Sequence, residues 1–479
     1  MAAIVTNNFR KENAQEWVNK LTDTTVGADN YFVGFGKSDS WPDEEAPAIP
    51  SNTETENRDV LRNLIGLIRI NTNANHSTAK SIVPRNAWAT GRRYKAYDPA
   101  DIDNFNSTTE GGDIIYPSYV ISDQKIYLCL KNGWDDVQNK AGVSTVNPIS
   151  SNITYGWEEM SDNYVWSYIG SITPTTNDFN TEQFIEVPGD NNITNDKPTK
   201  GLLYGFHVED GTYTGTINNS SFTAQILGED LDGNKIDPSV DVDVYFDGSE
   251  IVRVEFQNQT INDQSGDETT TFISNVKNAS VILKDGANAE IQGISIIPLV
   301  APAFGFGYTP SYDLPSTYVG VSVNFKSGVD DEVPFTTFRQ ISIIKNPGRV
   351  GVGDETISDD GYADVDAYDT LKSLQLQAAA TNVKVGDIIT GDTSGAKAYV
   401  DVVDSQTIKY HQNSNSDVNM IPFSDSENIS TESNPVGTIS NVVTPEYVPE
   451  SGEVLFLENR EAIQRSSNQT EQVKIVIQL

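Results

Sequence analysis

The chain has 479 residues, and its 68 acidic and 32 basic residues give a formal net charge of −36. This length allows roughly two to four domains, and so negative a surface would repel nucleic-acid phosphates and anionic membranes, which excludes both as expected partners. The single cysteine, Cys129, excludes an intrachain disulfide and favours folding in a reducing compartment.

Two segments near the N-terminus show apolar residues at helical spacing. The first places Phe9, Trp17 and Leu21 on roughly one face. The second, DVLRNLIGLIRI at 59–70, has a broader apolar stripe, and we predict a helix there. Its stripe would pack on its own domain or, alternatively, meet a second subunit. The stripe consists of Val60, Leu61, Leu64, Ile65 and Ile68.

Most of the remaining chain consists of short β-rich runs separated by Gly, Asn, Asp and Pro. This predicts a mainly β fold, a layered antiparallel β-sandwich core with a few helical excursions. Two stretches differ from the rest of the chain in their residue pattern and are interpreted as insertions: a β module at 188–299 and a smaller β and loop module at 380–450. The core would then combine 1–187, 300–379 and 451–479.

The last segment alternates apolar and polar residues up to its end. Val473, Ile475 and Ile477 would share one face of a strand. We therefore expect 451–479 to supply closing strands to the core, which a deletion would disrupt. No apolar run approaches the length needed to cross a bilayer, and the first residues lack the apolar core of a signal peptide.

Motifs for phosphate binding and zinc are weak. FGKSDSW at 35–41 copies the end of a phosphate-binding loop, but Tyr31 stands where an earlier glycine is needed, so a strand entering a loop is expected. The three histidines lie in different segments without metal-ligand spacing. They are His76, His207 and His411.

The segment DLDGNKID at 230–237 invites a calcium interpretation. Its glycine is at the fourth rather than the sixth position, and Asp241 replaces the usual twelfth-position glutamate, so we favour a hairpin turn while calcium stays an alternative. Cys129, inside KIYLCLK, is expected to be buried rather than reactive. We predict no catalytic residue, no metal ligand and no cofactor.

Six irregular motifs follow one another along the chain: AIVTNNFR (3–10), YFVGFGKSDSW (31–41), IVPRNAW with a nearby RRY (82–94), DNYVWSYIGSI (162–172), FRQISIIKNP (338–347), and GEVLFLENREAI (452–463) followed by NQTEQVKIVI (468–477). In this order they resemble baseplate wedge subunit eight of T-even-like contractile-tailed bacteriophages. The resemblance covers 1–187, 300 to about 350, and 451–479. It leaves out both stretches interpreted as insertions.

The resemblance implies a β-sandwich that forms a homodimer through helices and has a structural role. Such a protein joins other baseplate wedge proteins in the virion tail after assembly in the host cytoplasm. Segment 59–70 occupies the place of a family helix, which implies four candidate dimer contacts: Leu61, Leu64, Ile65 and Ile68. Four further residues match family motifs and are given structural roles: Arg85, Trp88, Trp166 and Arg339.

Two other functions stay open. A carbohydrate-binding tail adhesin would group exposed aromatic residues on one surface, particularly within 188–299. A polysaccharide-degrading tail enzyme would place two carboxylates in one cleft at the separation found in glycosidases.

Overall fold

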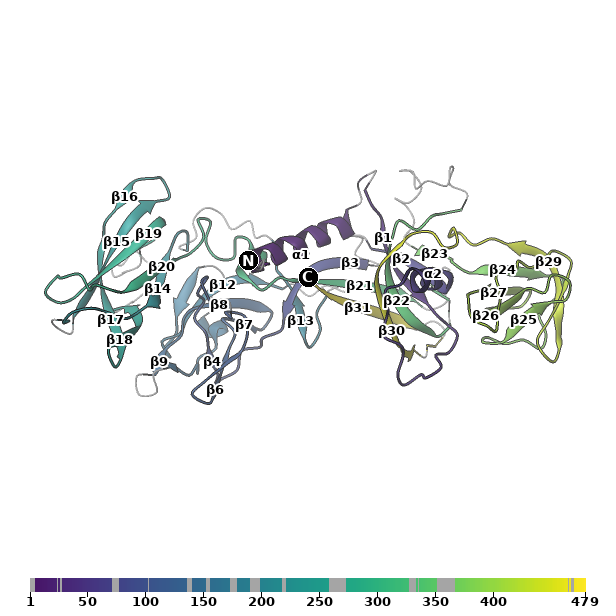
Figure 1. Ribbon diagram of the computed structural model, residues 1–479, viewed down its shortest axis with the longest axis horizontal. Coiled ribbons are helices and arrows are strands. Elements are labelled where there is room, and N and C mark those ends of the chain that lie inside the picture. Colours follow the sequence, from purple (N-terminus) through teal and green to yellow (C-terminus); the bar gives the residue numbers. More distant parts are fainter. Residues whose placement is uncertain are drawn as a thin grey trace. The chain divides into compact units, whose positions relative to one another are not determined.

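The computed structural model shows a mainly β protein with antiparallel sheets and few helices (Figure 1), which confirms the predicted fold class. The chain forms two compact units. Unit 1 contains 1–12, 81–174 and 180–317, and unit 2 contains 13–80, 175–179 and 318–479. The structure describes all residues except 1–4, 24, 26–27, 71–76, 102, 136–139, 152–155, 173–178, 190–198, 218–220, 258–272, 327–332, 335, 351–366, 464 and 467–468.

Unit 2 is built on a five-stranded antiparallel sheet with the order β23-β2-β1-β22-β30. The central strands are apolar along most of their length and buried along nearly all of it, as expected where both faces of a sheet are covered. The five strands are β1 (Tyr31–Gly36), β2 (Leu64–Arg69), β22 (Phe338–Lys345), β23 (Ala367–Tyr368) and β30 (Glu453–Ile463).

The helix predicted over 59–70 was wrong in its second half. Helix α2 covers Glu54–Arg62, with the Thr53 hydroxyl accepting a hydrogen bond from its first turn, and strand β2 begins at Leu64. Spacing alone cannot separate a short buried helix from a buried strand. Here the backbone of Leu64–Arg69 pairs with β1, with Val33 opposite Ile68, and this pairing makes the segment a strand rather than a continuation of the helix.

Helix α1 (Asn7–Thr22) confirms the helix predicted from the first segment. Its first residues belong to unit 1, and the rest, from residue 13 onward, belongs to unit 2. Leu21 is buried in the main core of unit 2 and Trp17 packs against that core, whereas Phe9 is exposed.

The C-terminal strand completes the main core of unit 2. Strand β31 (Thr470–Gln478) pairs with β21 (Tyr318–Lys326) along its whole length. Ile475 is buried in the core, and Val473 and Ile477 pack against it, so the predicted apolar face is confirmed.

A closed antiparallel barrel forms another part of unit 2 (Figure 1, yellow-green). It encloses an apolar core of its own, which includes Leu374, Ile408 and Ile439. The barrel begins before residue 380, inside the range expected to belong to the sandwich core. In barrel order its strands are β24 (Lys372–Leu376), β27 (Thr407–His411), β26 (Lys397–Asp404), β25 (Ile388–Gly391), β28 (Asn428–Ser430) and β29 (Pro435–Val443).

The central sheet of unit 1 has the order β11-β12-β8-β7. Alternate residues of β8 enter two different cores: Ile126 and Leu128 join a mainly aliphatic cluster, while Tyr127 and Cys129 join a mainly aromatic one. This alternation explains a layered arrangement, because both faces of the strand are covered. The strands are β7 (Tyr119–Ser122), β8 (Lys125–Lys131), β11 (Trp157–Glu159) and β12 (Val165–Ser171).

Smaller elements complete this body of unit 1. They are β3 (Ser77–Pro84), which enters the unit at residue 81, its partner β13 (Phe184–Glu186), the three-stranded set β4 (Arg93–Tyr94), β5 (Thr108–Glu110) and β6 (Asp113–Tyr116), the pair β9 (Trp134–Asp135) and β10 (Lys140–Ala141), the 3₁₀ helix η1 (Pro148–Ser151) and helix α3 (Pro310–Asp313).

The stretch interpreted as the larger insertion forms strands with a separate apolar core, which we call the inserted module (Figure 1, teal). Its turn at 230–237 is a hairpin turn, as favoured from the sequence: Asn234 donates from its backbone and its side chain to the Asp230 carboxylate. The strands are β14 (Leu203–Asp210), β15 (Phe222–Asp230), β16 (Lys235–Ile236), β17 (Ser239–Asp247), β18 (Glu250–Phe256), β19 (Val276–Lys284) and β20 (Ser295–Val300).

The single core expected from 1–187, 300–379 and 451–479 is divided between the two units. The reason is strand pairing. Strands β22 and β30 extend the sheet of β1, and β31 pairs with β21, all within unit 2, whereas β8 and β12 pair with each other in unit 1. No helix in the described ranges is long and apolar enough to cross a bilayer.

Candidate functional sites

The four candidate dimer contacts are buried inside unit 2. Leu61 and Leu64 belong to a cluster that contains Tyr447, and Ile65 and Ile68 belong to the main core. The stripe therefore packs within its own unit, the first of the two alternatives, because three of the four residues lie in strand β2 and all four are covered by the chain's own packing.

Three of the candidate structural residues stabilise unit 1. Arg85 donates from Nε to the Thr181 carbonyl at 2.9 Å, and Trp88 donates from its indole nitrogen to the Ser144 hydroxyl at 3.1 Å. Trp166 is fully buried and stacks on Tyr164 with ring centroids 5.6 Å apart. Trp166 is thus a core residue and Trp88 packs partly buried against the same core, whereas Arg85 is exposed and bonds to the backbone.

The fourth, Arg339 on β22, holds the loop that follows β1. Its Nε donates to Glu44 Oε1 at 2.8 Å, and its Nη1 donates to the Ser38 carbonyl at 2.5 Å. The segment FGKSDSW is thus a strand entering a fixed loop, as expected. A phosphate-binding loop would run directly into a helix, whereas the next helix in the described chain, α2, begins only at Glu54.

A buried ionic cluster joins this loop to the barrel. Nδ1 of His411, on β27, lies 2.8 Å from Asp401 Oδ2, and Nε2 lies 3.6 Å from Asp39 Oδ1. The Ser38 hydroxyl donates to the other oxygen of Asp401, and Lys37 pairs with Asp39 at 2.8 Å. We call these five residues the His411 cluster.

Electrostatics fix the charges of this cluster. Burial alone would lower the pKa of His411, but Asp401 and Asp39 outweigh it and raise that pKa to about 9. Burial also opposes ionisation of Asp39, yet His411 and Lys37 lower its pKa to about 2. At neutral pH the cluster therefore holds an imidazolium between two carboxylates.

The His411 cluster does not have the geometry of a serine nucleophile site. In such a site the serine and the acid contact opposite nitrogens of the histidine. Here Ser38 Oγ lies 3.4 Å from Nδ1, the nitrogen that already contacts Asp401, and its proton goes to Asp401. The arrangement is suited to fixing the barrel on the loop.

Sequence reasoning missed this cluster because its members lie far apart in the chain. His411 was considered only as a metal ligand, and Asp39 only as part of a loop motif. The available signal was local: Asp401 interrupts the apolar run AYVDVV of β26, where a buried carboxylate needs a partner. His76 lies outside the described residues.

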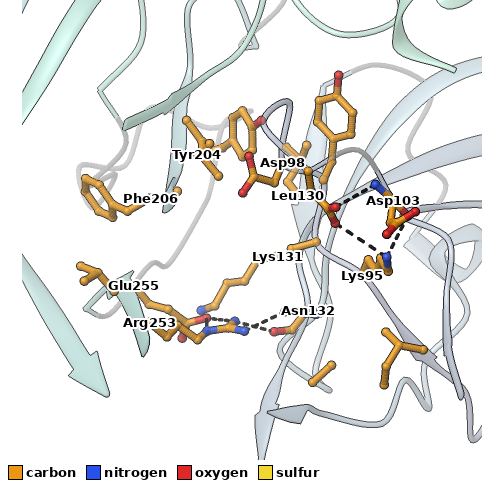
Figure 2. A pocket seen from close by; sticks show the side chains of 18 of the residues that line it. Lys95, Asp98, Asp103, Leu130, Lys131, Asn132, Tyr204, Phe206, Arg253 and Glu255 are labelled. Carbon is orange, nitrogen blue, oxygen red and sulfur yellow. Dashed lines mark hydrogen bonds and ion pairs between the residues drawn. The ribbon is translucent and has the colours of Figure 1, made fainter. Parts of the chain in front are cut away.

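A cavity of about 540 Å³ in unit 1 is lined by the body and by the inserted module (Figure 2). We call it the Arg253 cavity. Its body side includes Lys95, Tyr97, Asp98, Leu130, Lys131 and Asn132, and its module side includes Tyr204, Phe206, Arg253, Glu255 and Phe256.

Arg253 on β18 binds across this cavity to the body. Its Nη1 donates to Asn132 Oδ1 at 3.0 Å, its Nη2 donates to the Asn132 carbonyl at 2.9 Å, and its Nε donates to Glu255 at 2.7 Å. Figure 2 shows Lys131 beside this group. The Lys131 ammonium has a looser contact, 3.7 Å from Glu159.

Two more charged groups of the cavity wall have polar contacts. The Asp98 carboxylate contacts Nδ1 of His207, and the Lys95 ammonium donates to the Asp103 carbonyl at 2.8 Å and lies 3.7 Å from the Asp101 carboxylate. Tyr204 is only 4% exposed, and burial raises the pKa of its phenol; its hydroxyl has no hydrogen-bond partner among the residues described.

Cys129 has a free thiol in the mainly aromatic core of unit 1, where we expect it to be unreactive. Its side chain is fully buried, and burial raises the pKa of its thiol. We expect iodoacetamide to alkylate Cys129 at least about 100-fold more slowly in the native protein than in urea, measured by intact mass. Ser416→Cys at an exposed position is the matched control. Equal rates for the two thiols would contradict the buried placement.

Within the described part of the chain, no group of three or more His, Cys, Asp or Glu side chains is arranged to hold a metal ion. The Asp230 carboxylate, considered for calcium, instead accepts hydrogen bonds from Asn234.

In comparisons with known proteins, no protein-family model and no curated protein matches the chain.

Proposed function

We propose that the chain is a noncatalytic structural component of the baseplate wedge of a contractile phage tail. It would act as a dimeric scaffold that links neighbouring wedge proteins during baseplate assembly and sheath contraction. Its place would be the virion tail, after assembly in the host cytoplasm.

The observation that carries this proposal is the pairing of remote segments that resemble the wedge subunit. YFVGFG forms β1, FRQISIIK forms β22, and EVLFLENREAI forms β30. These three are adjacent strands of one sheet: Val33 lies opposite Ile343, which in turn lies opposite Phe456. An accidental likeness of separate motifs would not require them to be neighbours, so their pairing supports the resemblance.

Rigid paired elements are what a scaffold needs, because a body that keeps its shape can hold partners in register while contacts around it change. The net charge of −36 favours partners with basic surfaces. Dimerisation rests on the resemblance, and its contacts would lie outside Leu61, Leu64, Ile65 and Ile68, since these are buried.

Co-expression with the other wedge proteins of the same phage tests the proposal. We expect the chain to co-purify with at least one of them in a complex of fixed stoichiometry, measured by size-exclusion chromatography with light scattering. A folded chain that binds none of them would contradict the scaffold role, and a stable monomer at micromolar concentration would contradict the dimer.

A further inference from the structure

Strand β31 lies at the edge of its sheet. Among the described residues, it pairs with β21 on one side and is the last strand of the sheet on the other. An edge strand presents a row of backbone N–H and C=O groups with which another strand can pair. The nine pairs with β21 follow one another without a register shift, so no bulge bends β31. Its outer edge is therefore regular enough to accept a further strand.

The edge strand of the five-stranded sheet, β30, shows how such an edge is usually protected. Charged side chains and covering segments are common devices. Strand β30 contains three glutamates, and the carbonyl of its Arg460 accepts a hydrogen bond from the Trp41 indole N–H at 2.9 Å. The loop after β1 thus occupies one of the backbone acceptors that an added strand would need.

The outer edge of β31 has much less protection. Segment 472–479 contains no proline and no acidic residue, although 68 of the 479 residues of the chain are acidic. Its one charged side chain is that of Lys474, whose ammonium lies over the Phe179 ring, 5.8 Å from the centroid. Val476 is 36% exposed. This edge lacks negative charge in a chain whose net charge of −36 would otherwise repel a second copy.

The order of side chains along β31 fits a second copy of the same strand. Two identical strands can pair antiparallel about a twofold axis, and directly opposed residues then lie on the same face. With the axis at Val476, every opposed pair on the core face is apolar, and no two like charges are directly opposed. The opposed pairs are Val476 with its copy, Ile475 with Ile477, Val473 with Leu479, and Lys474 with Gln478.

The registers with the axis one or two residues earlier are less favourable. With the axis at Ile475, the carboxylate of Glu471 would lie opposite Leu479 on the core face, and one apolar pair would be lost. With the axis at Lys474, two ammonium groups would be directly opposed, which is destabilising. The sequence of the strand therefore favours the register centred on Val476.

We propose that two copies of the chain pair antiparallel through β31, with the twofold axis at Val476. This inference rests on the proposed dimer, to which it gives a contact, whereas the scaffold role does not depend on it. Backbone hydrogen bonds along the edge supply affinity, and the opposed side chains fix the register. Repulsion between more distant acidic surfaces is screened beyond about 8 Å at physiological ionic strength.

A disulfide across the axis tests the register in the full chain. Val476→Cys places one thiol of each copy at the axis, where opposed Cβ atoms lie about 4.5–5.5 Å apart, close to disulfide distance. We expect mild oxidation to crosslink this variant at least about tenfold faster than Thr470→Cys, measured on non-reducing gels. Thr470 is exposed on the same strand but lies outside the paired stretch 473–479. Equal crosslinking rates would overturn the proposal.

Val476→Lys tests the contact without a crosslink. The new ammonium groups would lie opposite each other and diagonal to Lys474 of the partner subunit. Because Val476 is 36% exposed, the fold should be retained, which near-ultraviolet circular dichroism checks. We expect the dissociation constant of the dimer to rise at least about tenfold by sedimentation equilibrium. Thr470→Lys makes the same change of charge outside the paired stretch and should dissociate like the parent.

The outcomes separate this contact from the dimer itself. A dimeric parent whose dissociation is unchanged in Val476→Lys would overturn the β31 contact and leave the proposed dimer standing. A monomeric parent would overturn both. A parent whose dimer is unaffected by Val476→Lys, while that variant no longer binds another wedge protein, would assign the edge to that protein and overturn the pairing of copies.

Discussion

Deletion of residues 470–479 is expected to abolish cooperative folding of unit 2. Without β31, strand β21 loses one of its two neighbouring strands, along nine residue pairs, and the main core loses Ile475 with its neighbours Val473 and Ile477. Loss of one buried isoleucine side chain costs about 2–5 kcal/mol, and a whole domain is stable by only about 5–15 kcal/mol. Urea unfolding followed by near-ultraviolet circular dichroism measures the effect.

Two point variants on the same strand separate packing from chain length. Ile475→Ala, at a residue 3% exposed, is expected to lower the free energy of unfolding of unit 2 by about 2–5 kcal/mol. Val476→Thr, at its neighbour that is 36% exposed, should change it by less than about 1 kcal/mol. If the truncated chain unfolds like the parent, the closing role of β31 is wrong.

His411→Ala is expected to destabilise unit 2 by about 3–5 kcal/mol, the usual cost of removing one partner from a buried ion pair. The substitution leaves the carboxylates of Asp39 and Asp401 buried without the cation between them. His207→Ala in unit 1 is the matched control: this histidine also pairs with an aspartate, but its side chain is 28% exposed, so a loss below about 1 kcal/mol is expected.

The same cluster predicts a pH dependence. The pKa of His411 is raised from 6.5 to about 9 in the folded state, so its stabilisation is fully present below pH 6.5 and is lost as pH rises through 9. The loss should be roughly 3 kcal/mol. Asp39, with a pKa lowered to about 2, stabilises above its ordinary value of 3.8 and loses this effect as pH falls toward 2.

Urea unfolding at pH 6, 7.5, 9 and 10 should therefore show falling stability of unit 2 in the parent. His411→Ala should remove most of this slope, because the group whose protonation differs between the folded and unfolded states is gone. A slope that persists unchanged in His411→Ala would show that other groups cause it.

Local patterns in the sequence determined much of the secondary structure. Alternation predicted β31 with its apolar face, the apolar run KIYLCLK became β8 with Cys129 buried, and the Asp-Gly turn at 230–237 became a hairpin. These features depend on neighbours in the chain. Side-chain direction in a strand and backbone freedom in a turn are set within a few residues.

Features that depend on remote partners were decided by the tertiary structure. The segment LIGLIR has helical spacing, yet hydrogen bonding to β1 makes it strand β2, so the candidate contacts Leu64, Ile65 and Ile68 became core residues.

The sequence by itself determined a mainly β, strongly acidic chain with one buried cysteine. Only the tertiary structure decided the division into two units, the meeting of Asp39 with His411, and the cavity that Arg253 spans. The physical reason is that strand pairing and buried charge compensation join groups hundreds of residues apart. No local pattern specifies which of many similar strands or carboxylates will be the partner.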